Sequence, residues 1–148
     1  MVRYIGIVGH GDNKFDINTK AAAIEKIIQL LSQPDVGLVS GHAPVGGIDI
    51  WAEDIADQLK IPKKIFAPAI FKWNPPGQYG FKARNLDIAK FSDEVLNIVV
   101  QKLPEGYTGP RYYDYHCKDS MPSHIKSGGC WTALQARKLG KPATWIIL

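Results

Sequence analysis

Cysteine is scarce in this sequence, which has two cysteines and two methionines among 148 residues. Two cysteines cannot build a disulfide framework, so we expect Cys117 and Cys130 to be thiols in a reducing compartment. The chain also lacks an apolar run of the roughly 18 residues that a membrane span needs, and its N-terminus lacks the apolar segment of a signal peptide. These absences predict a cytoplasmic protein with no membrane partner.

Clustered positive charge and internal repeats are missing too. The formal net charge is +4, but the basic residues are spread along the chain. Such a balance suits a small anionic ligand, and it makes nucleic-acid binding a weaker alternative. The length and the 45% hydrophobic content predict one globular domain over residues 1–148.

Short apolar segments alternate with amphipathic ones through most of the chain. Strands are predicted at residues 3–8, 36–40, 63–67, 95–100 and 143–148, and helices at residues 18–32, 48–59, 83–91 and 131–139. Asn18 or Thr19 is the expected cap of the first helix. This order predicts an α/β protein, a Rossmann-like three-layer α/β/α sandwich with a mainly parallel sheet of about five strands. Ligands of such sheets bind at the carboxyl ends of the strands.

Residues 101–127 form the longest segment without periodicity, and we predict a lid or a binding insertion there. Tyrosine and histidine side chains of this segment are suited to stacking on a base or to hydrogen bonding with a ligand. Packing of the segment onto the domain explains them equally well. These residues are Tyr107, Tyr112, Tyr113, Tyr115, His116 and His124.

Two glycine-bearing loops each lead from a predicted strand or insertion into a helix, where unpaired amides and the helix dipole favour phosphate. The first loop follows the second strand, and the second precedes the last helix. Hydroxyl groups accompany the glycines, and an aspartate is placed to cap a helix or reach a ribose hydroxyl. The residues are Ser40, Gly41, His42, Gly46 and Asp49 in the first loop, and Ser127, Gly128, Gly129 and Thr132 in the second.

Two further pairs complete the predicted site. Gly9 and His10 follow the first strand, although glycine is common in any such turn. Arg84 and Asn85 open a predicted helix, where the guanidinium could hold a phosphate and the amide could read a base or sugar. A solvated first turn is the alternative for this second pair.

A metal site must also be weighed, because His116, Cys117, His124 and Cys130 fall within fifteen residues. Zinc accepts a mixed set of cysteine and histidine ligands, but the spacing lacks a C-x-x-C or H-x-x-x-H pair. We therefore predict no metal and no cofactor. A Cys/His nucleophilic pair is equally unsupported, because no third residue is identified that would orient it.

The ordered set of these motifs resembles the SLOG superfamily, which includes DNA processing protein A and the lysine-decarboxylase-like LOG proteins, and is most similar to its small YspA-like domains. The matching stretches are IGIVG at residues 5–9, SGHAPVGGIDIWA at residues 40–52, the aromatic stretch around Trp73, Arg84-Asn85, and GGCWT followed by ARKLGKP at residues 128–142. The resemblance implies a nucleotide pocket formed by Gly9, Ser40, Gly41, Arg84, Gly128, Gly129 and Thr132.

Catalysis is not implied as directly. The LOG phosphoribohydrolases resemble P-G-G-x-G-T-x-x-E at the last loop, where this chain has Ser127, Trp131 and Gln135. A neutral amide replaces a carboxylate poorly as acid/base or as a stabiliser of an oxocarbenium-like sugar. We therefore predict binding or sensing of a nucleotide-derived phosphorylated ligand. A nucleoside 5′-monophosphate phosphoribohydrolase and a single-stranded nucleic-acid binder are the alternatives, and a homodimer is expected.

Overall fold

A parallel five-stranded sheet forms the centre of the computed structural model, which describes residues 1–110, 116–117 and 122–148. Its strands lie in the order β3-β2-β1-β4-β7, and every neighbouring pair is parallel. The chain moves from β1 outward to β3 and then returns to the other side of β1 with β4. This reversal places a switch point between β1 and β4. The bounds are β1 Arg3–Gly9, β2 Val36–Ser40, β3 Lys63–Ile65, β4 Glu94–Val99 and β7 Ala143–Ile147.

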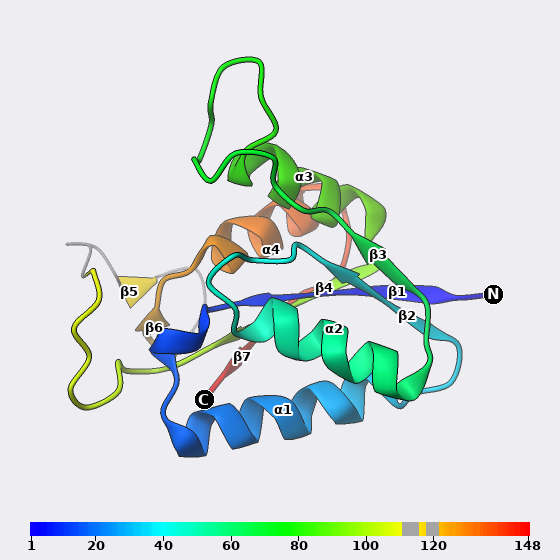
Figure 1. Ribbon diagram of the computed structural model, residues 1–148. Coiled ribbons are helices and arrows are strands. Elements are labelled where there is room, and N and C mark those ends of the chain that lie inside the picture. Colours follow the sequence, from blue (N-terminus) through cyan, green and yellow to red (C-terminus); the bar gives the residue numbers. More distant parts are fainter. Residues whose placement is uncertain (111–115, 118–121) are drawn as a thin grey trace.

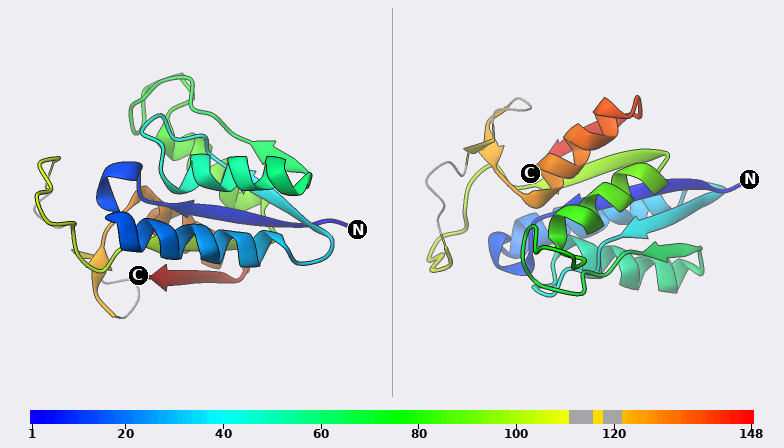
Figure 2. Two further views of the ribbon diagram at one scale, coloured as in Figure 1. Left: turned by 60° about the horizontal axis from the view of Figure 1, so that its bottom comes forward. Right: turned by 90° about the horizontal axis from the view of Figure 1, so that it is seen from above.

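Helices cover both faces of the sheet (Figures 1 and 2). Helices α1 (Ile17–Leu31) and α2 (Ile48–Leu59) pack on one face, and α3 (Phe81–Phe91) and α4 (Gly128–Lys138) pack on the other. A short 3₁₀ turn, η1 (Asp12–Lys14), follows β1. The predicted Rossmann-like three-layer fold is confirmed.

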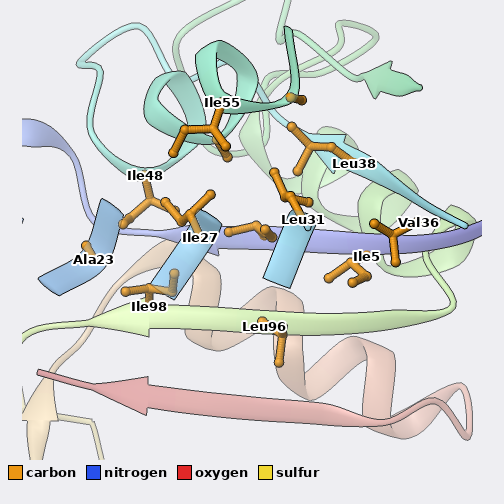
Figure 3. Packing of buried hydrophobic residues seen from close by; sticks show 13 residues of the cluster. Ile5, Ala23, Ile27, Leu31, Val36, Leu38, Ile48, Ile55, Leu96 and Ile98 are labelled. Atoms are coloured by element: carbon orange, nitrogen blue, oxygen red, sulfur yellow. The ribbon is translucent and has the colours of Figure 1, made fainter. Parts of the chain in front are cut away.

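The core explains why these segments form these elements (Figure 3). Helix α1 buries Ala23, Ile27 and Leu31, which are four residues apart and therefore lie on one side of the helix. They pack against β-branched residues of the sheet, such as Ile5 and Ile98, which are fully buried. Strands covered on both faces read as continuous apolar runs rather than as alternating ones.

Several predicted boundaries are wrong. Asp16 caps α1, because its carboxylate accepts from Thr19 N at 2.7 Å while the Thr19 hydroxyl accepts from Asp16 N at 2.9 Å. Helix α3 begins at Phe81, so Arg84 lies one turn inside the helix. Helix α4 begins at Gly128, before the predicted start at residue 131. Both helices begin earlier than predicted, because glycine and polar residues at their starts interrupt the apolar periodicity.

Part of the predicted insertion is regular. Strands β5 (His116–Cys117) and β6 (His124–Ile125) pair antiparallel, and this ribbon lies beyond the carboxyl ends of the main strands (Figure 1). Tyr112, Tyr113 and Tyr115 lie outside the described residues. Across the part of the chain that is described, no helix has the length and apolar character to cross a membrane.

Candidate functional site

A cavity of about 390 Å³ opens at the carboxyl edge of the sheet, where the end of β1 meets the loop after β2 and the N-terminal turns of α3 and α4. Each of the predicted loops contributes to its wall, through Gly9, Asp49, Arg84, Asn85, Gly128, Gly129 and Thr132. Segments far apart in the sequence therefore meet at one place. This is the edge at which ligands of doubly wound sheets bind.

Other predicted residues do not line this cavity. They are His10, Ser40, Gly41, His42, Gly46 and Ser127. Conversely, the predicted site does not include Ala43, Pro44 and Val45, which line the cavity from the loop after β2. Apolar residues in a turn carry no chemistry that sequence reasoning can single out.

Arg84 is the cation of the cavity, and it is buried with only 7% of its surface exposed. Its Nε donates to Asn85 Oδ1 at 2.6 Å, and its Nη1 donates to the carbonyl oxygen of Gly41. Asp49 Oδ2 lies 4.0 Å from Nη1. The predicted alternative of a solvated first turn is wrong, since the guanidinium is held in place by the loop after β2.

Asp49 does not cap α2 with its side chain, because the N-cap residue is Gly47. Instead its Oδ2 accepts from Ala43 N at 3.0 Å, which ties the loop after β2 to the helix. Burial raises the pKa of Asp49 to about 6, against the opposing effects of the Arg84 charge and the Ala43 amide. Burial also lowers the pKa of Arg84. An anion beside Arg84 would stabilise the charged guanidinium, and it would be bound more readily when Asp49 carries its proton.

This pKa predicts a pH dependence of stability. Between about pH 4 and pH 6 the folded state keeps the Asp49 proton that the unfolded state releases, so the contribution of this group to stability falls as pH rises. Across this pH window we expect the free energy of unfolding of the wild type to fall by up to about 3 kcal/mol relative to that of Asp49→Asn. Urea unfolding of both proteins from pH 4 to pH 8 measures it. If the stability of the two proteins changed in parallel with pH, the raised pKa of Asp49 would be contradicted.

A buried polar group that the sequence reasoning missed supports the loop after β2. Glu53 lies one turn beyond Asp49 on α2, and its two carboxylate oxygens contact Ser40 Oγ at 2.8 Å and His42 Nδ1 at 2.7 Å. The Ser40 hydroxyl, which the sequence suggested as a ligand contact, is therefore engaged by the protein. An acidic residue four positions after Asp49 on a buried helix face was the available signal.

The N-terminus of α4 offers backbone amides to the cavity. Ser127 is the N-cap residue, but its side chain makes no capping hydrogen bond, and Gly128 and Gly129 line the cavity directly. The first amides of a helix have no partner within the helix, and they carry its positive dipole end. Thr132 Oγ1 donates back to Gly128 O at 3.1 Å. This arrangement can hold an anion.

The two glycines at this turn differ in their surroundings. A Cβ at Gly129 would collide with the side-chain amide of Asn97 and lie 3.0 Å from Val8 Cγ2. A Cβ at Gly128 would meet only Asn85 Nδ2, at an ordinary 3.5 Å. Gly129 is therefore required by the packing of α4 on the sheet, whereas Gly128 leaves space for a ligand.

Aromatic side chains form the outer wall. Trp73 and Phe81 line the cavity, and the Phe81 ring lies 5.3 Å below the Arg84 guanidinium. Trp73 is 44% exposed and packs edge-on against Trp131, with ring centroids 5.3 Å apart. The loop that carries Trp73 extends beyond α3 (Figure 1). An exposed aromatic side chain such as Trp73 next to an anion site suits the stacking of a planar ring.

His10 is buried elsewhere, with 4% of its surface exposed. Its ring interacts with the backbone of Ile125 in β6, and its Nε2 has no hydrogen-bond partner among the described residues. Burial, assisted by the charge of Lys14, lowers the pKa of His10 to about 3. This histidine is therefore neutral at ordinary pH and faces the β5–β6 ribbon.

The comparisons with known proteins concern the fold. No family model matches the chain, and no curated protein matches its sequence. It is similar to the molybdenum cofactor carrier protein MCP of Chlamydomonas reinhardtii, with a TM-score of 0.60 and 17% identity over 98% of this chain and 76% of that one.

DNA processing protein A is a second similar fold. The Streptococcus pneumoniae protein has a TM-score of 0.59 at 18% identity, and the alignment covers 97% of this chain and 50% of that one. The Helicobacter pylori protein, described by its single-stranded DNA binding mode, has a TM-score of 0.59 at 19% identity, with coverage of 97% and 64%. The chain thus spans half to three quarters of these proteins, and at such identities the likeness shows a shared Rossmann-like fold.

Proposed function

We propose that the cavity binds a nucleotide or a nucleotide-derived phosphorylated ligand. The observation that carries this proposal is the meeting of the N-terminus of α4, where the Ser127 side chain makes no capping hydrogen bond, with the buried cation Arg84 on one cavity wall. Amides with a helix dipole and a guanidinium are the two groups that proteins use most directly to hold phosphate. The phosphate lies at Gly128, and the base or other ring lies toward Trp73 and Phe81.

The similar folds support a binding function without identifying the ligand. One is named as a carrier of the molybdenum cofactor, and another is described as binding single-stranded DNA. The cavity of about 390 Å³ and the spread of the basic residues along the sequence favour a small molecule over a strand. We also propose that the chain is related to the SLOG superfamily. Residues 1–148 would form one domain, and the protein would be a homodimer.

The experiment is a stability screen followed by calorimetry. Mononucleotides, dinucleotides, ADP-ribose, cyclic nucleotides and a single-stranded oligonucleotide are added to the chain, because a ligand that binds only the folded state stabilises it. At 100 times its Kd, a ligand contributes about 2.7 kcal/mol. We expect one phosphorylated class to raise Tm. No shift from any compound would contradict the proposal, and steeply salt-dependent binding of the oligonucleotide alone would favour the strand binder.

The variant Gly128→Asp tests whether the phosphate binds at the first turn of α4. A carboxylate in the first turn of α4 interacts favourably with the dipole, so stability should stay the same or rise by about 0.5 kcal/mol. The same carboxylate occupies and repels the phosphate position, so affinity should fall at least about 100-fold. Gly128→Asn is the matched control, since it adds the same volume without charge and should weaken binding less. Unchanged affinity in Gly128→Asp would place the ligand elsewhere.

A hydrolase is the second candidate, and Asp49 is the observation that favours it. This carboxyl lines the cavity with a pKa raised to about 6 by burial, which suits an acid/base group. Asp87 is less suited, because its Oδ2 accepts from the Tyr79 hydroxyl at 2.6 Å. Gln135 does not line the cavity. Release of free base from nucleoside monophosphates, lost in Asp49→Asn, would establish this reaction.

A further inference from the structure

Three soft ligand groups lie together next to the cavity, although their sequence spacing forms no recognisable metal motif. Cys117 of β5 and His124 of β6 are directly opposite each other in the antiparallel ribbon, and Cys130 lies in the first turn of α4. The two Sγ atoms and a ring nitrogen of His124 all lie within 4.8 Å of one another. Each of the three residues is at most 2% exposed. Neither cysteine is in a disulfide.

One pair of these groups already has the spacing of two ligands on a tetrahedral ion. With zinc–sulfur and zinc–nitrogen bonds of roughly 2.3 and 2.05 Å, two ligands at a tetrahedral angle are about 3.6 Å apart. The observed distance from Cys130 Sγ to His124 Nε2 is 3.5 Å. No rearrangement of this pair is needed to accommodate the ion.

The tautomer of His124 is also set. Its Nδ1 lies 3.2 Å from the carbonyl oxygen of Pro122, which can only accept, so Nδ1 carries the proton and donates. The lone pair of the neutral ring is therefore on Nε2, which is the nitrogen that faces Cys130. A backbone carbonyl that holds the other ring nitrogen is the usual outer partner of a metal-bound histidine.

A second histidine is close to this group. His10 interacts with the backbone of Ile125, the residue after His124, and its buried Nε2 has no hydrogen-bond partner among the described residues. An unpartnered buried nitrogen is costly unless something binds it. His10 is thus a second buried histidine beside the ribbon, and we expect a water molecule to be the fourth ligand of the ion.

We propose that Cys117, His124 and Cys130 form a zinc site that fastens the β5–β6 ribbon to the N-terminus of α4. Thiolate and imidazole ligands together favour zinc over the hard cations. Binding replaces the two thiol protons, which are released to solvent. Because Gly128 and Gly129 immediately precede Cys130 and line the cavity, the ion fixes the turn that presents their amides. The site does not depend on which ligand the cavity binds.

The test uses the full chain without a polyhistidine tag, purified under reducing conditions. We expect elemental mass spectrometry of the purified protein to find about one zinc ion per chain. We also expect a lower Tm after chelation, which zinc restores. Cobalt in place of zinc should give sulfur-to-metal charge-transfer absorption and the visible bands of a tetrahedral ion. The absence of both stoichiometric zinc and the cobalt spectrum in the wild type would overturn the proposal, and so would a Cys117–Cys130 disulfide in this material.

Single variants then identify the ligands. Cys117→Ser and Cys130→Ser should lower zinc affinity at least about 100-fold, because even loss of an outer partner costs 10 to 100-fold. His42→Ala is the matched control, since His42 contacts Glu53 on α2 and should leave one zinc bound. Full zinc content in Cys130→Ser would overturn the site. The cobalt spectrum of the wild type reports thiolate ligation even if a variant fails to fold.

Discussion

Replacing Arg84 with methionine is expected to lower affinity for the phosphorylated ligand at least about 100-fold. Each charge-assisted hydrogen bond to phosphate contributes about 1.5–3 kcal/mol, and a guanidinium can make two of them. The same change leaves Asp49 buried without its 4.0 Å partner. At pH 8 we therefore also expect a loss of about 3–5 kcal/mol in the free energy of unfolding, as for other buried pairs that lose one member.

The double variant Arg84→Met/Asp49→Asn separates the two effects. Removing both charges should recover most of the lost stability, because no unpaired charge remains buried. Binding should stay as weak as in the single variant, since the phosphate still lacks its cation. Calorimetry and urea unfolding of the wild type and both variants measure this. A double variant that regains both stability and affinity would mean that Arg84 acts only through the fold.

Gly129→Ala should be the more damaging of two neighbouring substitutions in α4. Its new methyl group would collide with the Asn97 amide and press on Val8, and both of these side chains are buried. We expect a loss of about 2–3 kcal/mol in the free energy of unfolding, the range for overpacked interiors. Chemical denaturation measures this loss directly.

Gly128→Ala is its matched control. Its methyl group meets only Asn85 Nδ2 at 3.5 Å, and alanine is the better helix former. Stability should stay the same or rise by up to about 1 kcal/mol. Equal losses in the two variants would contradict the division of this turn into one glycine for packing and one for the ligand.

Much of the architecture could be predicted from sequence because buried parallel strands are continuous apolar runs. Residues 36–40 were predicted as a strand with the bounds that β2 has. Helix starts were harder, because glycine at Gly128 and Gly129 reads as a turn although the first turn of a helix tolerates it. The cap of α1 was also wrongly predicted, because several adjacent polar residues could cap the helix and Asp16 is the one that does.

The candidate site was predicted only in part. Glycine, hydroxyl and arginine residues at helix starts carry chemistry that can be read locally, and Arg84, Gly128 and Gly129 do line one cavity. The partners of these groups come from distant segments and leave no local pattern. Glu53, which engages Ser40, is one example. The meeting of Cys117, His124 and Cys130 is another, because a ribbon and a helix turn bring them together rather than a short motif.

A crystal structure of the chain grown with the nucleotide that raises Tm most would test the central claim directly. We predict density for a phosphate group within hydrogen-bond distance of the first α4 amides and the Arg84 guanidinium, with the ring of the ligand against Trp73 or Phe81. Density for the ligand at any other surface, with the turn at Gly128 empty, would contradict the account.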